Sequence, residues 1–123
     1  MPNPVVHFEI LGKDHEALQQ YYRDLFDWKI TLASPEFPYG VVSQEDQGAG
    51  IGGGVGSSMD GNPQTAFYVE VDDIQASLDR AAELGGEVAM PVTVIPGMVI
   101  FAHFKDIEGN LIGLVSSEVP PTE

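Results

Sequence analysis

The strongest constraint on the fold of this chain is a repeated order of predicted secondary-structure elements. Each half of the sequence predicts a strand, a helix and then three further strands. In the first half the strands fall at residues 5–10, 28–32, 39–44 and 50–55, and the helix begins after Asp14. In the second half they fall at residues 65–71, 87–94, 98–104 and 110–115, and the helix begins after Asp73. We therefore expect one domain of two βαβββ modules, at about residues 1–60 and 61–117, with a frayed tail at 118–123.

The two helices carry the clearest local signals. Asp14 is a typical N-cap, and apolar residues then recur at the i, i+3, i+4 spacing of an amphipathic helix: Ala17, Leu18, Tyr21, Tyr22, Leu25 and Phe26. Asp73 precedes a second helix, and Gly85-Gly86 predicts a left-handed C-terminal cap. The glycine-rich residues 45–65 predict a short strand at 50–55 and a loop at 57–64. They lack the Gly-Lys-Ser/Thr ending of a phosphate loop.

The repeat also predicts how the modules are built. Placing Asp73 on Asp14 gives an offset of 73 − 14 = 59 residues, which aligns His7 with Ala66 and Gly54 with Gly113. In each module one helix would cover one face of a small sheet and leave the other face uncovered. Two such faces turned toward each other would enclose a cavity. The predicted fold class is α+β, with the two modules forming a cupped mixed sheet.

Charge and composition narrow the range of partners. The chain has 5 Lys and Arg against 19 Asp and Glu, a formal net charge of −14. The few cations are scattered, so we expect neither nucleic acid nor a membrane surface as a partner. The chain has no cysteine, which excludes disulfides and thiolate metal sites, and no apolar run long enough to span a bilayer. These features predict a cytoplasmic protein whose ligand is neutral or cationic rather than anionic.

Five segments carry a resemblance to a known superfamily: residues 6–10, 21–28, 68–74, 85–86 and 104–110. In these segments the chain resembles the vicinal oxygen chelate superfamily, which includes glyoxalase I, extradiol dioxygenases and the bleomycin and fosfomycin resistance proteins. The last segment is similar to the Asp-Pro-x-Gly-Asn turn of that superfamily, with Ile107 where proline is usual. The resemblance implies the glyoxalase/bleomycin-resistance fold and, as is common in that superfamily, a homodimer. It does not imply one activity, because this fold carries several.

The resemblance also implies a place for a divalent metal ion. In the superfamily the ligands are His or Glu on the first and last strands of each module. His7 matches the first of these positions, but the others fall near Gly54, on Ala66 and on Gly113. One imidazole holds a divalent ion weakly, so we expect no metal and no other cofactor, with His7 as the one residual candidate ligand. We expect Gly54 and Gly113 instead to enlarge the cavity and to open backbone groups to a ligand.

The predicted ligand-binding residues are His7, Glu9, Tyr68, Glu70, Gly54 and Gly113. His7 and Glu9 share one strand face, where they could form a general base with its orienting partner or only a hydrogen-bonded surface pair. Tyr68 could donate a hydrogen bond to a ligand or simply line the pocket.

Other histidine and aromatic residues have structural interpretations. The face that His103 occupies cannot be predicted, and a structural role is favoured for it. His15 is predicted to be exposed and without function. Trp28, Phe37 and Tyr39 are interpreted as core or dimer contacts.

Three functions are compatible with these residues. The preferred hypothesis is a protein that binds a small, neutral or cationic, partly apolar molecule in the cavity between the modules, without a metal. The alternative is an enzyme: a metal-dependent lyase, isomerase or dioxygenase with ligands such as His7, Glu9 and His103, or a metal-free lyase or isomerase with His7 as the base. A third hypothesis is a protein that associates with partners through its sheet edges.

Overall fold

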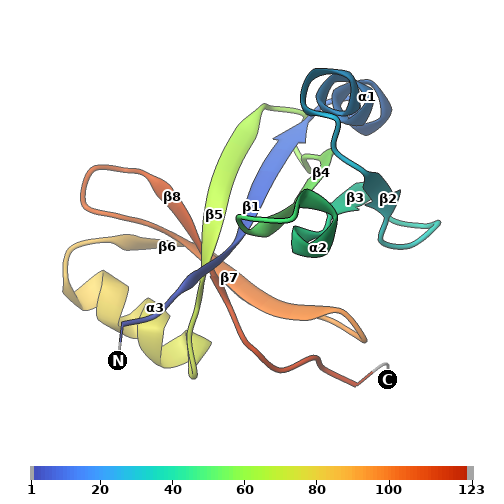
Figure 1. Ribbon diagram of the computed structural model, residues 1–123. Coiled ribbons are helices and arrows are strands. Elements are labelled where there is room, and N and C mark those ends of the chain that lie inside the picture. The colour runs from blue at the N-terminus through green and yellow to red at the C-terminus, as the bar shows by residue number, and fades with distance from the viewer. Residues whose placement is uncertain (1, 122–123) are drawn as a thin grey trace. The chain divides into compact units, whose positions relative to one another are not determined.

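The computed structural model describes residues 2–121 of the 123-residue chain. Figure 1 shows the element order: β1 (Val5–Gly12), α1 (His15–Phe26), β2 (Ile30–Leu32), β3 (Tyr39–Val42), α2 (Gln44–Gln47), β4 (Gly52–Ser57), β5 (Gln64–Glu70), α3 (Ile74–Glu83), β6 (Glu87–Ile95), β7 (Val99–Lys105) and β8 (Leu111–Val115). This order confirms the α+β class and the two βαβββ modules. The residues group into two compact units, which we call the N-terminal unit (Val6–Ala66) and the C-terminal unit (residues 2–5 and 67–121).

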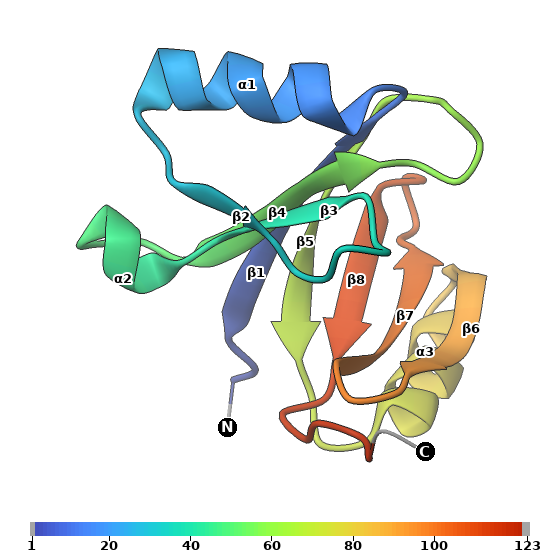
Figure 2. The same ribbon diagram turned by 90° about the vertical axis from the view of Figure 1, so that its right-hand side faces the viewer.

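The N-terminal unit has the strand order β2-β3-β4-β1, in which β1 is parallel to β4 and β3 is antiparallel to both of its neighbours. The helix α1 begins where the sequence predicts, because the Asp14 side chain accepts a hydrogen bond from the amide of Ala17. It packs on one face of this sheet, mainly against β4 (Figure 2). The core between them is formed by Ile30, Val42 and Val55, with Phe8, Ile10, Leu18, Tyr22 and Trp28 packed around it. The interpretation of Trp28 as a core residue is therefore confirmed.

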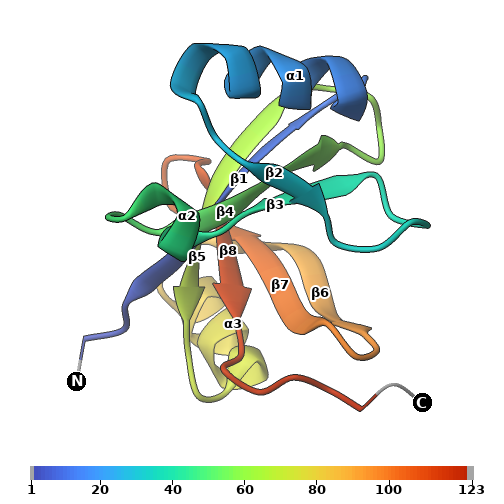
Figure 3. The same cartoon turned by 45° about the vertical axis from the view of Figure 1, so that its right-hand side comes forward.

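The short helix α2 is the one element that the sequence did not predict. It takes up Gln44, which we expected at the end of a strand, and the first residues of the glycine-rich segment 45–65, for which we expected no helix (Figure 3). Ser43 caps it by accepting a hydrogen bond from the amide of Glu45, and Gly48 ends it in the left-handed region at a φ of 78°. A helix of four residues is too short to show an amphipathic period.

The C-terminal unit has the strand order β5-β8-β7-β6, in which β5 is parallel to β8 and β7 is antiparallel to both of its neighbours. Asp73 caps α3 as Asp14 caps α1, by accepting a hydrogen bond from the amide of Ala76. The core of this unit is formed by Val71, Ile74, Leu78, Ala102 and Leu114. Repetition of the cap and of the strand pairing in both units accounts for the repeat in the sequence.

The tail after β8 contacts the turn between β6 and β7, and fraying of residues 118–121 stays a prediction. The backbone oxygens of Pro120 and Pro121 accept hydrogen bonds from the amide of Gly97 at 3.1 and 3.2 Å, and Pro120 is buried. The last two residues of the predicted tail, 122–123, lie outside the described residues.

Strand register confirms the 59-residue offset. Glu9 on β1 pairs with Gly54 on β4, and Tyr68 on β5 pairs with Gly113 on β8. Both members of the second pair lie 59 positions after their counterparts, since 68 − 9 and 113 − 54 give the same value. Within residues 2–121, none of the helices is long and apolar enough to cross a membrane.

Candidate functional site

In both units the predicted site residues lie on the sheet face that points away from the helix. On β1, Phe8 and Ile10 pack into the core beneath α1, so His7 and Glu9 point to the opposite face. On β5, Val69 packs against the core beneath α3, and Val71, directly after the strand, lies in that core, so Tyr68 and Glu70 point to the opposite face. The predicted sharing of faces is therefore confirmed for both pairs.

A chain of hydrogen bonds joins three side chains of the N-terminal unit. The Tyr39 hydroxyl lies 2.7 Å from Nε2 of His7 and donates to Oε2 of Glu9 at 3.0 Å. Since the hydroxyl proton is directed to Glu9, the hydroxyl oxygen accepts the proton carried on Nε2 of His7. We call these three residues the His7–Tyr39–Glu9 network.

Burial sets the charge of His7. Removal of the imidazole from water lowers the pKa of His7 below its ordinary value, because the low-dielectric surroundings disfavour the cation. Glu9, on the same face, is 9% exposed. At neutral pH the network therefore presents a neutral imidazole beside a nearly buried carboxyl group. Such an imidazole can accept a proton or a hydrogen bond.

Tyr39 also explains the glycine at position 54, and here the structure corrects our interpretation. A Cβ atom added to Gly54 would collide with the phenol ring of Tyr39, and one added to Gly113 would collide with the ring of Tyr68. The space that these glycines leave is therefore filled by tyrosine rings, and our expectation that Gly54 and Gly113 enlarge a cavity was wrong. The physical reason is that a flat ring can pack directly on a strand backbone only where no side chain intervenes.

Tyr39 is the functional candidate that sequence reasoning missed, since we interpreted it as a core or dimer contact. Its ring reaches Gly54 diagonally, because Tyr39 pairs with Gly56 and the next residue on the same face, Val41, pairs with Gly54. The sequence offers one indication of this contact, a tyrosine in a predicted strand that precedes a glycine-rich strand. The contact itself depends on the register of β3 against β4, which the sequence does not give.

The C-terminal unit holds a second, smaller polar cluster. The hydroxyl of Tyr68 lies 2.7 Å from Nε2 of His103, and the two residues are only 6% and 8% exposed. Both pair with Gly113, which places His103 on the same face as Tyr68 and answers the question that the sequence left open. The ring of Phe101 lies 6.4 Å from that of Tyr68 and 5.5 Å from that of His103. Burial lowers the pKa of His103 as it does for His7.

The donor set does not fit the metal site that the resemblance implies. Among residues 2–121, no three His, Cys, Asp or Glu side chains are grouped so that they could hold a metal ion. Nε2 of His7 is engaged by Tyr39, and tyrosine rings cover the two glycines. A hard divalent ion needs several converging oxygen or nitrogen ligands, which these positions do not supply.

Two further observations concern residues outside these clusters. His15 is partly buried, and its Nδ1 lies 3.2 Å from the Ser57 hydroxyl oxygen, so the expectation of an exposed imidazole was wrong.

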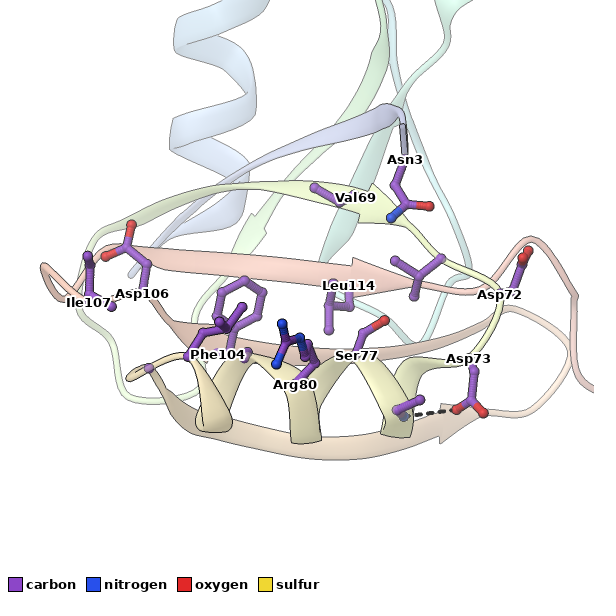
Figure 4. Close-up of a pocket in the computed structure, with 15 residues that line it drawn as sticks. Asn3, Val69, Asp72, Asp73, Ser77, Arg80, Phe104, Asp106, Ile107 and Leu114 are labelled. Atoms are coloured by element: carbon purple, nitrogen blue, oxygen red, sulfur yellow. Dashed lines mark hydrogen bonds between the residues drawn. The ribbon is translucent and has the colours of Figure 1, made fainter. Parts of the chain in front are cut away.

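A cavity of about 600 Å³ lies in the C-terminal unit beside α3 (Figure 4). None of the six predicted ligand-binding residues lines it.

Comparison with known proteins identifies relatives across nearly the whole chain. The family model described as Glyoxalase/Bleomycin resistance protein/Dioxygenase superfamily matches residues 5–114. A glyoxylase-like domain-containing protein from Didymella fabae is 29% identical over 108 residues, which cover 83% of this chain and 84% of that protein.

Solved structures share the fold. A variant of methylmalonyl-CoA epimerase from Streptomyces coelicolor, in complex with 2-nitronate-propionyl-CoA, has a TM-score of 0.66 at 14% identity and covers 100% of both chains. A glyoxalase/bleomycin resistance protein/dioxygenase superfamily member from Vibrio splendidus has a TM-score of 0.60 at 15% identity, over 94% of this chain and 98% of that chain. At such identities the two structures show likeness of fold alone.

Proposed function

Since this chain belongs to the glyoxalase/bleomycin resistance protein/dioxygenase superfamily, we propose that it binds a small, neutral or cationic, partly apolar molecule without the help of a metal ion. The observation that carries the proposal is the His7–Tyr39–Glu9 network. It replaces a set of metal ligands with polar groups that can hold a ligand by hydrogen bonds.

The chemistry of the network selects the ligand class. A neutral imidazole and a carboxyl group on one face favour a molecule that donates hydrogen bonds, such as an amine or an alcohol. The net charge of −14 attracts cations and repels anions. Of the other candidates, Tyr68 and Glu70 lie on the corresponding strand of the C-terminal unit, and Gly54 and Gly113 contribute by seating the two tyrosine rings. A ligand position between the two modules stays a prediction from the sequence.

A screen with matched variants tests the binding proposal. Thermal-shift measurements against cationic antibiotics and small metabolites should find compounds that raise Tm, and titration calorimetry should then give Kd. We expect Tyr39→Phe and His7→Gln to weaken binding about ten-fold, the loss of one good hydrogen bond to a buried partner. His15→Gln is the control, because it changes a partly buried histidine outside the network. Failure of every compound to stabilise the fold would count against a binding function.

The lowered pKa of His7 supports an enzyme as the second candidate. In a metal-free lyase or isomerase, the imidazole of His7 would accept a proton from the substrate, while Tyr39 and Glu9 hold the ring in position. Incubation of small carbonyl compounds in deuterium oxide would reveal this activity as deuterium incorporated next to the carbonyl group. His7→Ala should abolish the exchange in an enzyme, whereas in a binding protein it should only weaken affinity.

Three other predictions remain open to direct measurement. Metal analysis of protein purified without chelator should find no stoichiometric divalent ion, and such an ion bound at His7 would contradict the proposal.

Light scattering should give the mass of a homodimer, and a monomer would overturn that expectation. A cytoplasmic location stays a prediction from the sequence, which fractionation of the source cells would test.

A further inference from the structure

The cavity beside α3 is a long groove with an apolar floor and charged ends. Its floor is formed by the sheet side chains Val69, Phe104 and Leu114, and Ala76 of α3 forms part of its wall. Figure 4 shows Asp72 and Asp73 at one end of the groove and Asp106 at the other. A volume of about 600 Å³ is in the range of sites that hold small molecules.

The groove exists because α3 covers only part of its sheet. The helix packs mainly against β6 and β7, at one edge of the strand order β5-β8-β7-β6. The face of β5 beside the helix is therefore covered incompletely, and Val69 stays only partly buried, as does Phe104 on β7. An apolar surface that its own helix does not cover is available to an apolar ligand.

The charges around the groove favour a cation. Three carboxyl groups line it against one guanidinium, that of Arg80. Nη1 of Arg80 lies 3.3 Å from Oε1 of Glu83, and both side chains are about two-thirds exposed, so solvent and Glu83 weaken the repulsion that Arg80 exerts. The positive end of the α3 dipole amounts to about half a charge, less than the two carboxylates beside it.

The two ends differ in how much hydrogen-bonding capacity remains. The Asp106 carboxylate already accepts hydrogen bonds from the side chain and the amide of Asn110 and from the amide of Glu108, which hold the pKa of Asp106 below its usual range. The Asp73 carboxylate accepts one, from the amide of Ala76. Since a carboxylate has about four acceptor positions, the Asp72–Asp73 end is the better partner for a donor with several protons.

We propose that the groove is a second binding site, for an aliphatic amine whose chain lies on Val69 and Phe104 and whose ammonium group lies at the Asp72–Asp73 end. The apolar floor supplies affinity through burial of the chain. The carboxylates supply selectivity for a cation over an anion of the same length. The site is separate from the His7–Tyr39–Glu9 network, so the two proposals can fail independently.

The test uses n-octylammonium as the probe, with n-octanoate as its anionic counterpart of equal chain length. Titration calorimetry should show saturable binding of one octylammonium per chain, with octanoate at least about ten-fold weaker. Ala76→Trp should fill the groove and weaken octylammonium at least about ten-fold. Ala82→Trp is the matched control, because Ala82 is exposed on the same helix and does not line the groove. It should leave Kd unchanged.

A second pair of variants tests the charge. Asp72→Asn should weaken octylammonium about three-fold, the effect of one exposed ion pair, while Asp79→Asn, elsewhere on the surface of α3, should not. Absence of binding to the unaltered protein, equal affinity for octanoate, or an Ala76→Trp variant that binds normally would each overturn the proposal. Loss of octylammonium binding in His7→Gln would also overturn it, because the amine would then occupy the network site and support the proposed function instead.

Discussion

Tyr39 combines two roles in one side chain. Its ring fills the space over Gly54, and its hydroxyl joins His7 to Glu9. The alternation of a strand was enough to place His7 and Glu9 on one face. It could not show that Tyr39, thirty residues further along the chain, would reach them. At the scale of single residues, local pattern predicted the direction of a side chain and failed to predict its long-range partner.

The packing of Tyr39 on Gly54 predicts a strong coupling between these two positions. Gly54→Ala should lower the free energy of unfolding by about 2 kcal/mol, because the new methyl group displaces the ring. In a Tyr39→Ala background the same substitution should cost less than about 0.5 kcal/mol, since the ring is gone. Urea denaturation of the unaltered protein, the two single variants and the double variant measures the coupling between the two positions. Equal costs in both backgrounds would show that the ring does not occupy that space.

The two buried histidines predict a dependence of stability on pH. Burial lowers the pKa of His7 and of His103 in the folded protein below the value of about 6.5 that each takes when unfolded. As the pH falls below about 6.5, the unfolded state binds protons that the folded state does not, so stability declines; above that pH it is constant. Urea denaturation at a series of pH values should show this decline, and a His7→Gln, His103→Gln double variant should show less of it. An unchanged profile in the double variant would assign the decline to other groups.

At the scale of elements, short segments formed by local signals were the best predicted. Both long helices begin after the aspartates that the sequence identified, and the turn after β7 forms as its residues indicate. In that turn the amide of Gly109 donates to the backbone oxygen of Asp106 at 3.0 Å, and Gly109 has a φ of 93°. Ile107, where the superfamily's turn has proline, takes the first central position and is 74% exposed.

That geometry predicts a stabilising substitution. Proline suits the first central position of such a turn, so Ile107→Pro should raise the free energy of unfolding by about 0.5 kcal/mol through the entropy of the unfolded chain. Glu108→Pro is the matched control at the second central position. It should destabilise the protein, because it removes the amide that donates to Asp106. Thermal unfolding measures both, and a lower Tm for Ile107→Pro would contradict the assigned turn.

At the scale of the whole molecule, charge is the dominant sequence property. Nineteen carboxylates against five cations repel one another in the folded chain. Salt should therefore raise Tm at pH 7 when its concentration is increased from about 0.01 M to about 1 M, which shortens the screening length from about 30 Å to about 3 Å. At a pH near 4.2, where the net charge approaches zero, the same increase should have much less effect. A salt response of equal size at both pH values would show that charge repulsion is not its cause.

The sequence by itself determined the order of the strands and of the two long helices, the starts of those helices, the repeat and the faces of β1 and β5, because these depend on neighbours a few residues apart. Tertiary structure decided the rest. The contacts of Tyr39, the face of His103 and the groove beside α3 depend on strand register and on where a helix crosses its sheet. Those features join residues far apart in the chain, and no local periodicity encodes which of several registers buries the most surface.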